Sequence, residues 1–272
     1  MNAAIPDIIA LKARLQAMWS AGDFGRIARS HESGAQAFIA RLHLAPGSRV
    51  LDVACGTGNL AIPAARAGTI VTGVDIASNL VEQARQRAKA EGLVVEFHEG
   101  DAENLPYEDG SFDTVMTMFG AMFAPQPEKA AAELKRVCRP KGHIVMANWV
   151  PTGFIGQMFK IIAARVPPPA GMPSPLLWGD ETVVRERLQK KIAHIQFTRR
   201  MMTFEFPFAP AEVVEHWRQY YGPTQKAFDA LDTDGQRDLR TNLTALWEKH
   251  NRGDGAATRV ESEYLEVVAT RA

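Results

Sequence analysis

Short apolar runs alternate with helical patterns between residues 48 and 150, and this alternation constrains the fold more than any other feature of the sequence. Strands that alternate with helices at this spacing predict a parallel sheet with both faces covered by helices. The expected strands are 50–53, 70–75, 93–97, 112–118 and 143–149, and the expected helices are 60–67, 80–91 and 128–138. The sequence therefore predicts an α/β fold.

The segments on either side of this core follow other patterns. Residues 7–42 have apolar residues at helical spacing, with a break at Gly22-Asp23. Beyond residue 150 the alternation ends, and the prolines of 166–175 predict a loop or hinge. The patterns that follow are a helix at 181–193, a strand at 197–206, further helices within 210–250 and a last strand at 259–270.

We therefore divide the chain into three parts. Residues 1–44 are expected to form an N-terminal helical lid, and residues 45–150 the α/β core. Residues 151–272 are expected to form a helical cap insertion and the final antiparallel strands of the sheet.

Composition excludes several classes of protein. The chain has 31 Lys+Arg and 31 Asp+Glu, which argues against a nucleic-acid binder with a basic face. Cys55 and Cys138 form no Cys-x-x-Cys pair, so a disulfide framework and a zinc ribbon are excluded. No apolar run is long enough to span a membrane, and no histidine pair has metal-ligand spacing. We expect a cytoplasmic protein with no membrane span and no metal site.

A glycine-containing segment, residues 52–58, follows the first expected strand and opens a helix. Glycines at Gly56 and Gly58 allow a sharp turn and close approach of a ligand, while the helix supplies free N–H groups. Asp75 ends the second strand, where a carboxylate can bind both hydroxyls of a ribose. These features predict a nucleotide-type ligand, and Gly56-x-Gly58-x-x-Ala61 also fits a dinucleotide fingerprint.

Four sequence segments, taken in chain order, indicate which nucleotide-type ligand is expected. They are the segment 52–58, Val74-Asp75, Gly100-Asp101-Ala102 with Leu105-Pro106, and Leu134–Val137 through Pro140-Lys141-Gly142. As a set they resemble the class I S-adenosylmethionine-dependent methyltransferases, in particular the small-molecule branch typified by ubiquinone/menaquinone C-methyltransferases. The resemblance covers roughly residues 45–150. It implies a Rossmann-like, seven-stranded, mostly parallel sheet and S-adenosylmethionine as the cofactor.

The resemblance also implies roles for single residues. Gly56 and Gly58 would face the amino-acid part of the cofactor, with Asp52 stabilising the loop and the ammonium group. Asp75 would bind the ribose and Ile76 would lie on the adenine. The rest of the implied cofactor-binding set is Ala54, Thr57, Asp101, Ala102, Glu103 and Phe119. Ala54 departs from the glycine that is frequent in the family.

Within this set, Asp101 would accept a hydrogen bond from the adenine amino group and Ala102 would offer its backbone N–H. Phe119 would line the methionine side, near the methyl group. Methyl transfer is an in-line displacement at an activated carbon, so the protein has mainly to align two reactants and exclude water.

The acceptor site is less constrained by the sequence. His31 is a candidate general base, with a packing role as the alternative. Met122, Trp149 and Tyr221 are expected to line the substrate pocket. The sequence predicts O-, N- or C-methylation of a small molecule and allows a homodimer. An NAD-dependent oxidoreductase and a non-enzymatic cofactor-binding module remain alternatives.

Overall fold

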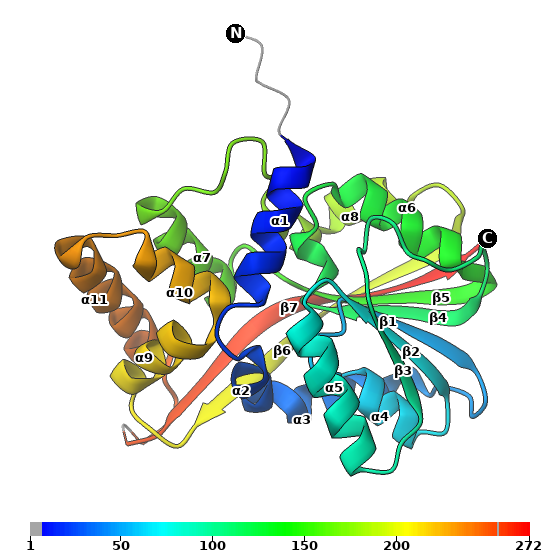
Figure 1. Cartoon of the computed structure of the whole chain (residues 1–272), viewed down its shortest axis with the longest axis horizontal. Helices are drawn as coiled ribbons and strands as arrows, with labels where there is room; N and C mark the ends of the chain where they lie inside the picture. The colour runs from blue at the N-terminus through cyan, green and yellow to red at the C-terminus, as the bar shows by residue number, and fades with distance from the viewer. Residues whose placement is uncertain (1–6, 255) are drawn as a thin grey trace, which may run out of the picture.

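The computed structural model describes residues 7–254 and 256–272, and a seven-stranded sheet runs through it (Figure 1). The strand order is β3-β2-β1-β4-β5-β7-β6. The strands are β1 (Arg49–Val53), β2 (Ile70–Asp75), β3 (Val95–Glu99), β4 (Phe112–Met118), β5 (Cys138–Trp149), β6 (Ile192–Phe206) and β7 (Thr258–Arg271). The five strands from β1 to β5 are parallel, whereas β7 pairs antiparallel with both β5 and β6. The predicted seven-stranded, mostly parallel sheet is confirmed.

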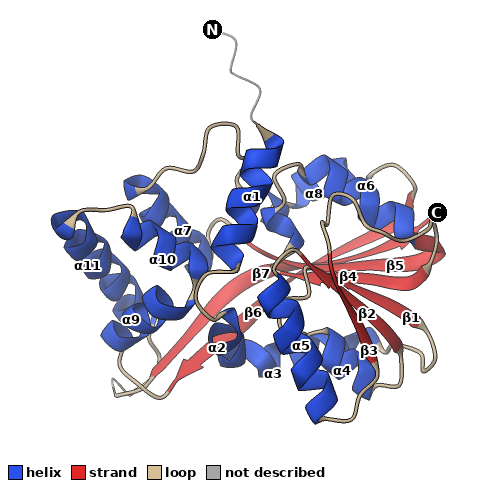
Figure 2. Cartoon of the chain, in the orientation of Figure 1, coloured by secondary structure: helices blue, strands red, loops and turns tan. Residues whose placement is uncertain are grey.

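Helices cover both faces of this sheet (Figure 2). Helices α3, α4 and α5 lie on one face and α6 and α8 on the other (Figure 1). The described helices are α1 (Ile8–Trp19), α2 (Phe24–Ala28), α3 (Glu32–Leu42), α4 (Ala61–Arg66), α5 (Ser78–Ala90), α6 (Pro127–Val137), α7 (Phe154–Arg165), α8 (Glu181–Leu188), α9 (Pro210–Tyr220), α10 (Gly222–Asp229) and α11 (Thr233–His250). Single 3₁₀ turns form η1 (Arg29–His31), η2 (Ala121–Phe123) and η3 (Pro175–Gly179).

Helix α6 shows how sequence produces this arrangement. Pro127 occupies its first turn, where the missing N–H group costs nothing. Ala130, Leu134 and Val137 recur at helical spacing and are all buried, so one face of the helix packs on β4 and β5.

Helices α7, α9, α10 and α11 form a separate cluster, which we call the cap, at the far end of β6 and β7 (Figure 1). The N-terminal helices lie between this cap and the core. Helix α1 packs against α10, and α2 packs against α9. An isolated backbone bridge joins Gly22 to Tyr221, so the N-terminal helices are attached to the cap as well as to the core.

Several expected boundaries are wrong, three of them by five residues: the fifth strand begins at Cys138 and not at residue 143, and the other two lie between α8 and β6. The helix expected at 181–193 ends at Leu188, and the strand expected from 197 begins at Ile192. Pairing explains the difference, because β6 follows β7 from Phe206 opposite Thr258 to Ile192 opposite Arg271. Residues with a helical pattern are thus recruited into the sheet by a partner distant in sequence.

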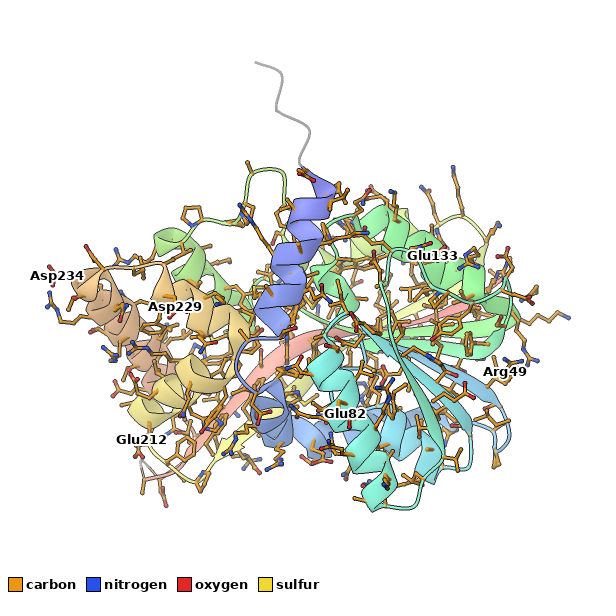
Figure 3. The ribbon with its side chains drawn as sticks, viewed as in Figure 1. Arg49, Glu82, Glu133, Glu212, Asp229 and Asp234 are labelled. Atoms are coloured by element: carbon orange, nitrogen blue, oxygen red, sulfur yellow. The ribbon has the colours of Figure 1, made fainter. Side chains whose placement is uncertain are left out.

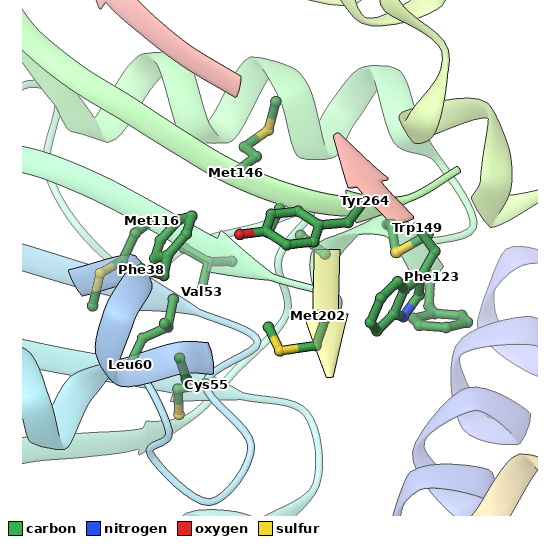
Figure 4. Packing of buried hydrophobic residues seen from close by; sticks show 14 of the residues in the cluster. Phe38, Val53, Cys55, Leu60, Met116, Phe123, Met146, Trp149, Met202 and Tyr264 are labelled. Atoms are coloured by element: carbon green, nitrogen blue, oxygen red, sulfur yellow. The ribbon is translucent and has the colours of Figure 1, made fainter. Parts of the chain in front are cut away.

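The hydrophobic core extends along the sheet to its antiparallel part, where β7 lies between β5 and β6. Trp149, Met202 and Tyr264 come from these three strands and gather there (Figure 4). Charged side chains of both signs cover the outer surface, with Arg49 and Glu133 on the core and Glu212 on the cap (Figure 3).

Candidate active site

A cavity opens at the carboxyl ends of β1, β2 and β4, next to the point where the strand order reverses. It encloses about 990 Å³, its open mouth included. Of the predicted site residues, those that line it are His31, Asp52, Ala54, Gly56, Thr57, Asp75, Ile76, Asp101, Ala102 and Phe119. Ligands of open α/β sheets bind at this kind of position, so the fold and the predicted residues indicate the same site.

The loop after β1 takes an unusual backbone path. Ala54, Gly56 and Gly58 have φ angles of 56°, 52° and 84°, in the left-handed region. The Cys55 N–H donates to the carbonyl of Val74 at 3.0 Å, which ties the loop to β2. Because glycine adopts such angles without strain, the two glycines turn the chain into α4 at this point.

Two buried carboxylates face the cavity from neighbouring strands. Asp75 accepts the N–H groups of Gly56 at 2.8 Å and Ala77 at 2.9 Å, and Asp52 accepts the Ala61 N–H at 3.0 Å. Within the described residues neither carboxylate is paired with a lysine or arginine. Burial raises the pKa of Asp75 and raises the pKa of Asp52 well above its usual range, where the nearby charge of Asp75 adds to the effect.

These carboxylates are the test of whether a cationic cofactor fits. A buried carboxylate is costly unless a positive charge or hydrogen-bond donors compensate it. A ligand with an ammonium group and hydroxyl groups would supply the positive charge and the hydrogen-bond donors that Asp52 and Asp75 lack. The donor set therefore fits a cationic nucleoside.

Helix α1 lies across the side of the cavity formed by the loops after β2 and β3. Lys12 Nζ lies 2.5 Å from Asp101 Oδ2 and 2.6 Å from Glu103 Oε2. Gln16 Nε2 donates to the Ile76 carbonyl at 3.1 Å and to Glu99 Oε1 at 2.9 Å. These four contacts hold the helix over the position expected for adenine.

A cluster centred on Arg87 connects the loop after β1 to the N-terminal helices. Its Nη1 donates to the Thr57 carbonyl and to Asn59 Oδ1, both at 2.8 Å. Its Nη2 donates to Glu32 Oε1 at 2.6 Å, and Asn59 Nδ2 donates to the Ala28 carbonyl at 3.0 Å. Glu32 follows His31 directly, so this cluster fixes His31 relative to the loop after β1. Sequence reasoning missed Arg87, because it lies on α5 and no local motif marks it.

His31 enters the cavity wall from η1. Its ring lies 5.3 Å from the Phe204 ring and 6.4 Å from the Phe119 ring. Its Nδ1 is buried and has no hydrogen-bond partner in the described part of the chain. Burial lowers the pKa of His31 to about 4, although the Ile27 carbonyl acts in the opposite direction, so the imidazole is neutral at physiological pH.

Several predicted residues lie outside the cavity wall. Met122, Trp149 and Tyr221 are buried behind it. The Trp149 ring stacks on the Phe119 ring with their centroids 3.5 Å apart, and the centroids of the Tyr221 and Trp19 rings are 5.7 Å apart. Gly58 and Glu103 also do not line the cavity, because Gly58 turns the chain into α4 and the buried Glu103 side chain contacts Lys12 and Gln126.

Other residues, to which the sequence analysis assigned no role in the site, also line the cavity. They are Lys12, Leu15, Trp19, Phe24, Asn59, Leu60, Leu80, Met118, Gly120, Phe123 and their neighbours Cys55, Gly100, Ala121, Ala124 and Pro125. The aromatic side chains of Trp19 and Phe24 come from the N-terminal helices, and they pack edge to face at 5.6 Å. The break at Gly22-Asp23 is the sequence signal that could have indicated a helix folding back over the core.

Two features are absent from residues 7–254 and 256–272. These residues contain no cluster of three or more histidine, cysteine or acidic side chains arranged to bind a metal ion. None of the helices described is both long and apolar enough to cross a membrane.

Comparison with known proteins places the chain in a family. Residues 51–146 match the model of a methyltransferase domain. An uncharacterised protein of Mycobacterium tuberculosis is 36% identical over 265 residues, which is 96% of this chain and 95% of that protein. The demethylmenaquinone methyltransferase of Thermus thermophilus is 40% identical over 124 residues, or 44% of this chain and 56% of that enzyme.

Solved structures agree on the fold. The YcgJ protein of Bacillus subtilis superposes with a TM-score of 0.60 at 17% identity, covering 88% of this chain and 98% of that one. A putative methyltransferase of Bacillus halodurans gives a TM-score of 0.58 at 19% identity, covering 86% and 97%. The chain belongs to the class I S-adenosylmethionine-dependent methyltransferases. It is thus an enzyme of a family that binds S-adenosylmethionine, and the oxidoreductase alternative loses its support.

Proposed function

We propose that this enzyme binds S-adenosylmethionine in the cavity and transfers its methyl group to a small-molecule acceptor. The observation that carries the proposal is the pair of buried carboxylates, Asp52 and Asp75, without a cationic partner among the described residues. The similarity to a demethylmenaquinone methyltransferase supports a small acceptor.

Each side of the cavity would bind one part of the cofactor. Asp52, with the backbone of Ala54, Gly56 and Thr57, would hold the amino-acid part, and Gly58 would shape the turn. Asp75 would accept the ribose hydroxyls, since its oxygens already face the cavity beside the loop.

The adenine would lie between Ile76 and Ala102. Its amino group would donate to Asp101, whose Oδ2 is now shared with Lys12 and whose Oδ1 accepts the Glu103 N–H at 2.9 Å. Glu103 would act indirectly in this arrangement by holding Lys12 and, with it, helix α1.

When bound, the cofactor supplies a methyl group on a positively charged sulfur, which departs readily. The chain's own residues would orient the acceptor in line with it and exclude water. Phe119 and the aromatic rings of the N-terminal helices lie around this part of the cavity, and such faces favour a cationic methyl group.

Calorimetric titration with S-adenosylhomocysteine and with NAD tests the proposal. S-adenosylhomocysteine should bind and NAD should not. In Asp75→Ala the affinity should fall at least about tenfold, because hydrogen bonds from hydroxyls to a charged group are lost. Unchanged affinity in this variant, or preferential binding of NAD, would contradict the assignment.

We also propose that the enzyme works in the cytoplasm. Both cysteines are free and buried, which suits a reducing compartment. A fusion to a fluorescent protein in cells tests this location.

A further inference from the structure

The part of the cavity that the cofactor would leave free has a uniform chemistry. We assign to it the larger apolar lining residues Leu15, Trp19, Phe24, Met118, Phe119 and Phe123, of which Phe24 also faces Gly56 of the loop after β1. Aromatic rings on α2, η2 and the loop after β4 give it flat faces. An acceptor that fits this wall has flat, apolar surfaces.

Charged groups are confined to the other side. The lining carboxylates Asp52, Asp75 and Asp101 all lie where the cofactor would bind. Lys12 is the single basic residue among the described lining residues, and its ammonium group already forms ion pairs with Asp101 and Glu103. An acceptor with a carboxylate, phosphate or ammonium group would therefore be desolvated without a partner, at a large cost in binding free energy.

One polar side chain interrupts the apolar wall. His31 is 7% exposed and lies against Phe119, the residue expected beside the methyl group. Its Nδ1 is enclosed by protein atoms, so Nε2 is the ring nitrogen left to face the cavity, and Nε2 has no hydrogen-bond partner among the described residues. Buried polar groups in proteins nearly always have a partner, so an imidazole whose Nε2 faces the cavity without one is suited to bind a polar group of the ligand.

The position of His31 is fixed by contacts of the next residue in the chain, Glu32. The Arg87 cluster joins Glu32, the next residue, to the loop that would bind the cofactor. An imidazole fixed relative to both reactants is suited to a role in transfer between them.

We propose that the acceptor is a neutral, flat, apolar molecule with a hydroxyl group, and that His31 takes up the hydroxyl proton as the methyl group is transferred. This inference rests on the proposed function. The acceptor oxygen forms a bond to the methyl carbon while the carbon–sulfur bond breaks, and the electron pair of that bond goes to sulfur. The proton passes from the oxygen to the unprotonated nitrogen of His31 and then to water. A base of this kind is effective because the hydroxyl becomes strongly acidic as the new bond forms.

The first experiment measures binding to the protein loaded with S-adenosylhomocysteine, by equilibrium dialysis of three probes of matched shape. We expect 2-naphthol to bind about tenfold more tightly than naphthalene, because one hydrogen bond is added. 2-Naphthol should also bind at least about tenfold more tightly than 2-naphthoate. Equal or tighter binding of 2-naphthoate would overturn the inference, and this ranking requires no variant.

The second experiment asks whether His31 recognises the hydroxyl. In His31→Phe, which keeps an aromatic ring between its neighbours, the preference for 2-naphthol over naphthalene should fall to within about twofold. His31→Leu serves as the second variant. Affinity for S-adenosylhomocysteine should stay within about twofold in both, since His31 lies on the acceptor side. A preference that survives both substitutions would overturn the role of His31.

The third experiment measures transfer. With S-adenosylmethionine, 2-naphthol should yield 2-methoxynaphthalene, and kcat should be at least about 100-fold lower in His31→Phe with KM for the cofactor unchanged. Absence of this product in the wild type would overturn the hydroxyl as the accepting group. If S-adenosylhomocysteine itself fails to bind, the proposed function is wrong, whereas intact cofactor binding with a preference for charged probes contradicts this inference alone.

Discussion

Ala54 and Gly120 bring two loops of the site into direct contact. Ala54 has a left-handed backbone, with φ of 56°, where glycine is the more common residue. A Cβ added at Gly120 would lie 2.5 Å from the Ala54 Cβ and 2.7 Å from its carbonyl oxygen. The methyl group of Ala54 therefore occupies the space that glycine at 120 leaves open. The departure from the family pattern at residue 54 is accommodated at residue 120.

We predict that Gly120→Ala raises the Kd for S-adenosylhomocysteine at least about tenfold, because the loops after β1 and β4 must move apart. Calorimetry gives the affinity. Ala54→Gly is the matched control, and it should keep or slightly raise stability by relieving about 1 kcal/mol of backbone strain. The double variant should recover part of the affinity, since the contact between the two Cβ atoms is gone. Wild-type affinity in Gly120→Ala alone would show that the loops are not closely packed.

The lowered pKa of His31 predicts a pH dependence of folding. The unfolded chain binds a proton on this residue below about pH 6.5, but the folded chain does so only near its pKa of about 4. Stability is therefore lost as the pH falls from 6.5 towards 4, and no loss arises above 6.5. Between pH 7 and pH 5 this amounts to about 2 kcal/mol.

Urea unfolding of the wild type and of His31→Phe at pH 7 and pH 5 measures this contribution of His31 to the free energy of unfolding. All other groups are the same in the two proteins, so their contributions cancel in the difference. The wild type should lose about 2 kcal/mol more than the variant. Parallel loss in the two proteins would contradict a buried, neutral imidazole.

Residues at strand ends were the predictable part of the site. Asp52 and Asp75 lie at the carboxyl ends of β1 and β2 and Asp101 follows β3, and the carboxyl ends of parallel strands meet at one edge of a sheet. The sequence could therefore place them together without knowledge of the packing. Trp19 and Arg87 could not be found in this way, because they reach the site from helices whose positions depend on tertiary contacts.

Helix α1 lies across the side of the cavity where we propose that the adenine binds. The Asp7 side chain caps its N-terminus by accepting the Ala10 N–H, but this cap stabilises the helix itself and does not fix its position on the core. Lys12 and Gln16 instead attach it to the loops after β2 and β3. Its position thus depends on side-chain contacts that a ligand at the same loops would rearrange.

We predict that Lys12→Gln accelerates dissociation of S-adenosylhomocysteine about five- to tenfold, because two partly buried ion pairs at the cover are lost. Stopped-flow fluorescence of the tryptophans measures the rate. Arg14→Gln removes an exposed charge from the same helix, at a residue with no ion pair in the described structure, and should leave the rate unchanged. Equal rates in both variants and the wild type would show that α1 is not the cover.

At the scale of elements, local pattern predicted most of the core correctly. The strands expected at 70–75 and 112–118 have those bounds in the structure. The sequence failed at 181–193, where pairing with β7 extends β6 into a helical pattern. Pairing over such a sequence separation has no local signal.

The cap contributes to the site without touching it. Every described lining residue lies between Lys12 and Pro125, so the expected direct contribution of Tyr221 to the wall is not seen. Tyr221 instead packs 5.7 Å from Trp19 and 6.2 Å from Phe24, which do line the cavity. The cap therefore acts on the acceptor side by supporting the N-terminal helices.

We predict that Tyr221→Ala costs about 3–5 kcal/mol of stability and weakens binding of 2-naphthol, because support for Trp19 and Phe24 is removed. Chemical unfolding and equilibrium dialysis measure the two effects. Tyr221→Phe keeps the ring and should match the wild type in both. Weakened binding in Tyr221→Phe would mean that the hydroxyl group, and not the ring, matters at this position.

The placement of β7 between β5 and β6 has a consequence for biosynthesis. A ribosome delivers β6 well before β7, with the three helices α9, α10 and α11 in between. The parallel strands β1 to β5 can assemble as they emerge, but β6 has no neighbour to pair with until β7 follows. Nascent chains would therefore carry a long unpaired strand, a species prone to aggregation, for the time it takes to translate the cap. Chaperone dependence of this enzyme during translation should be concentrated in that interval.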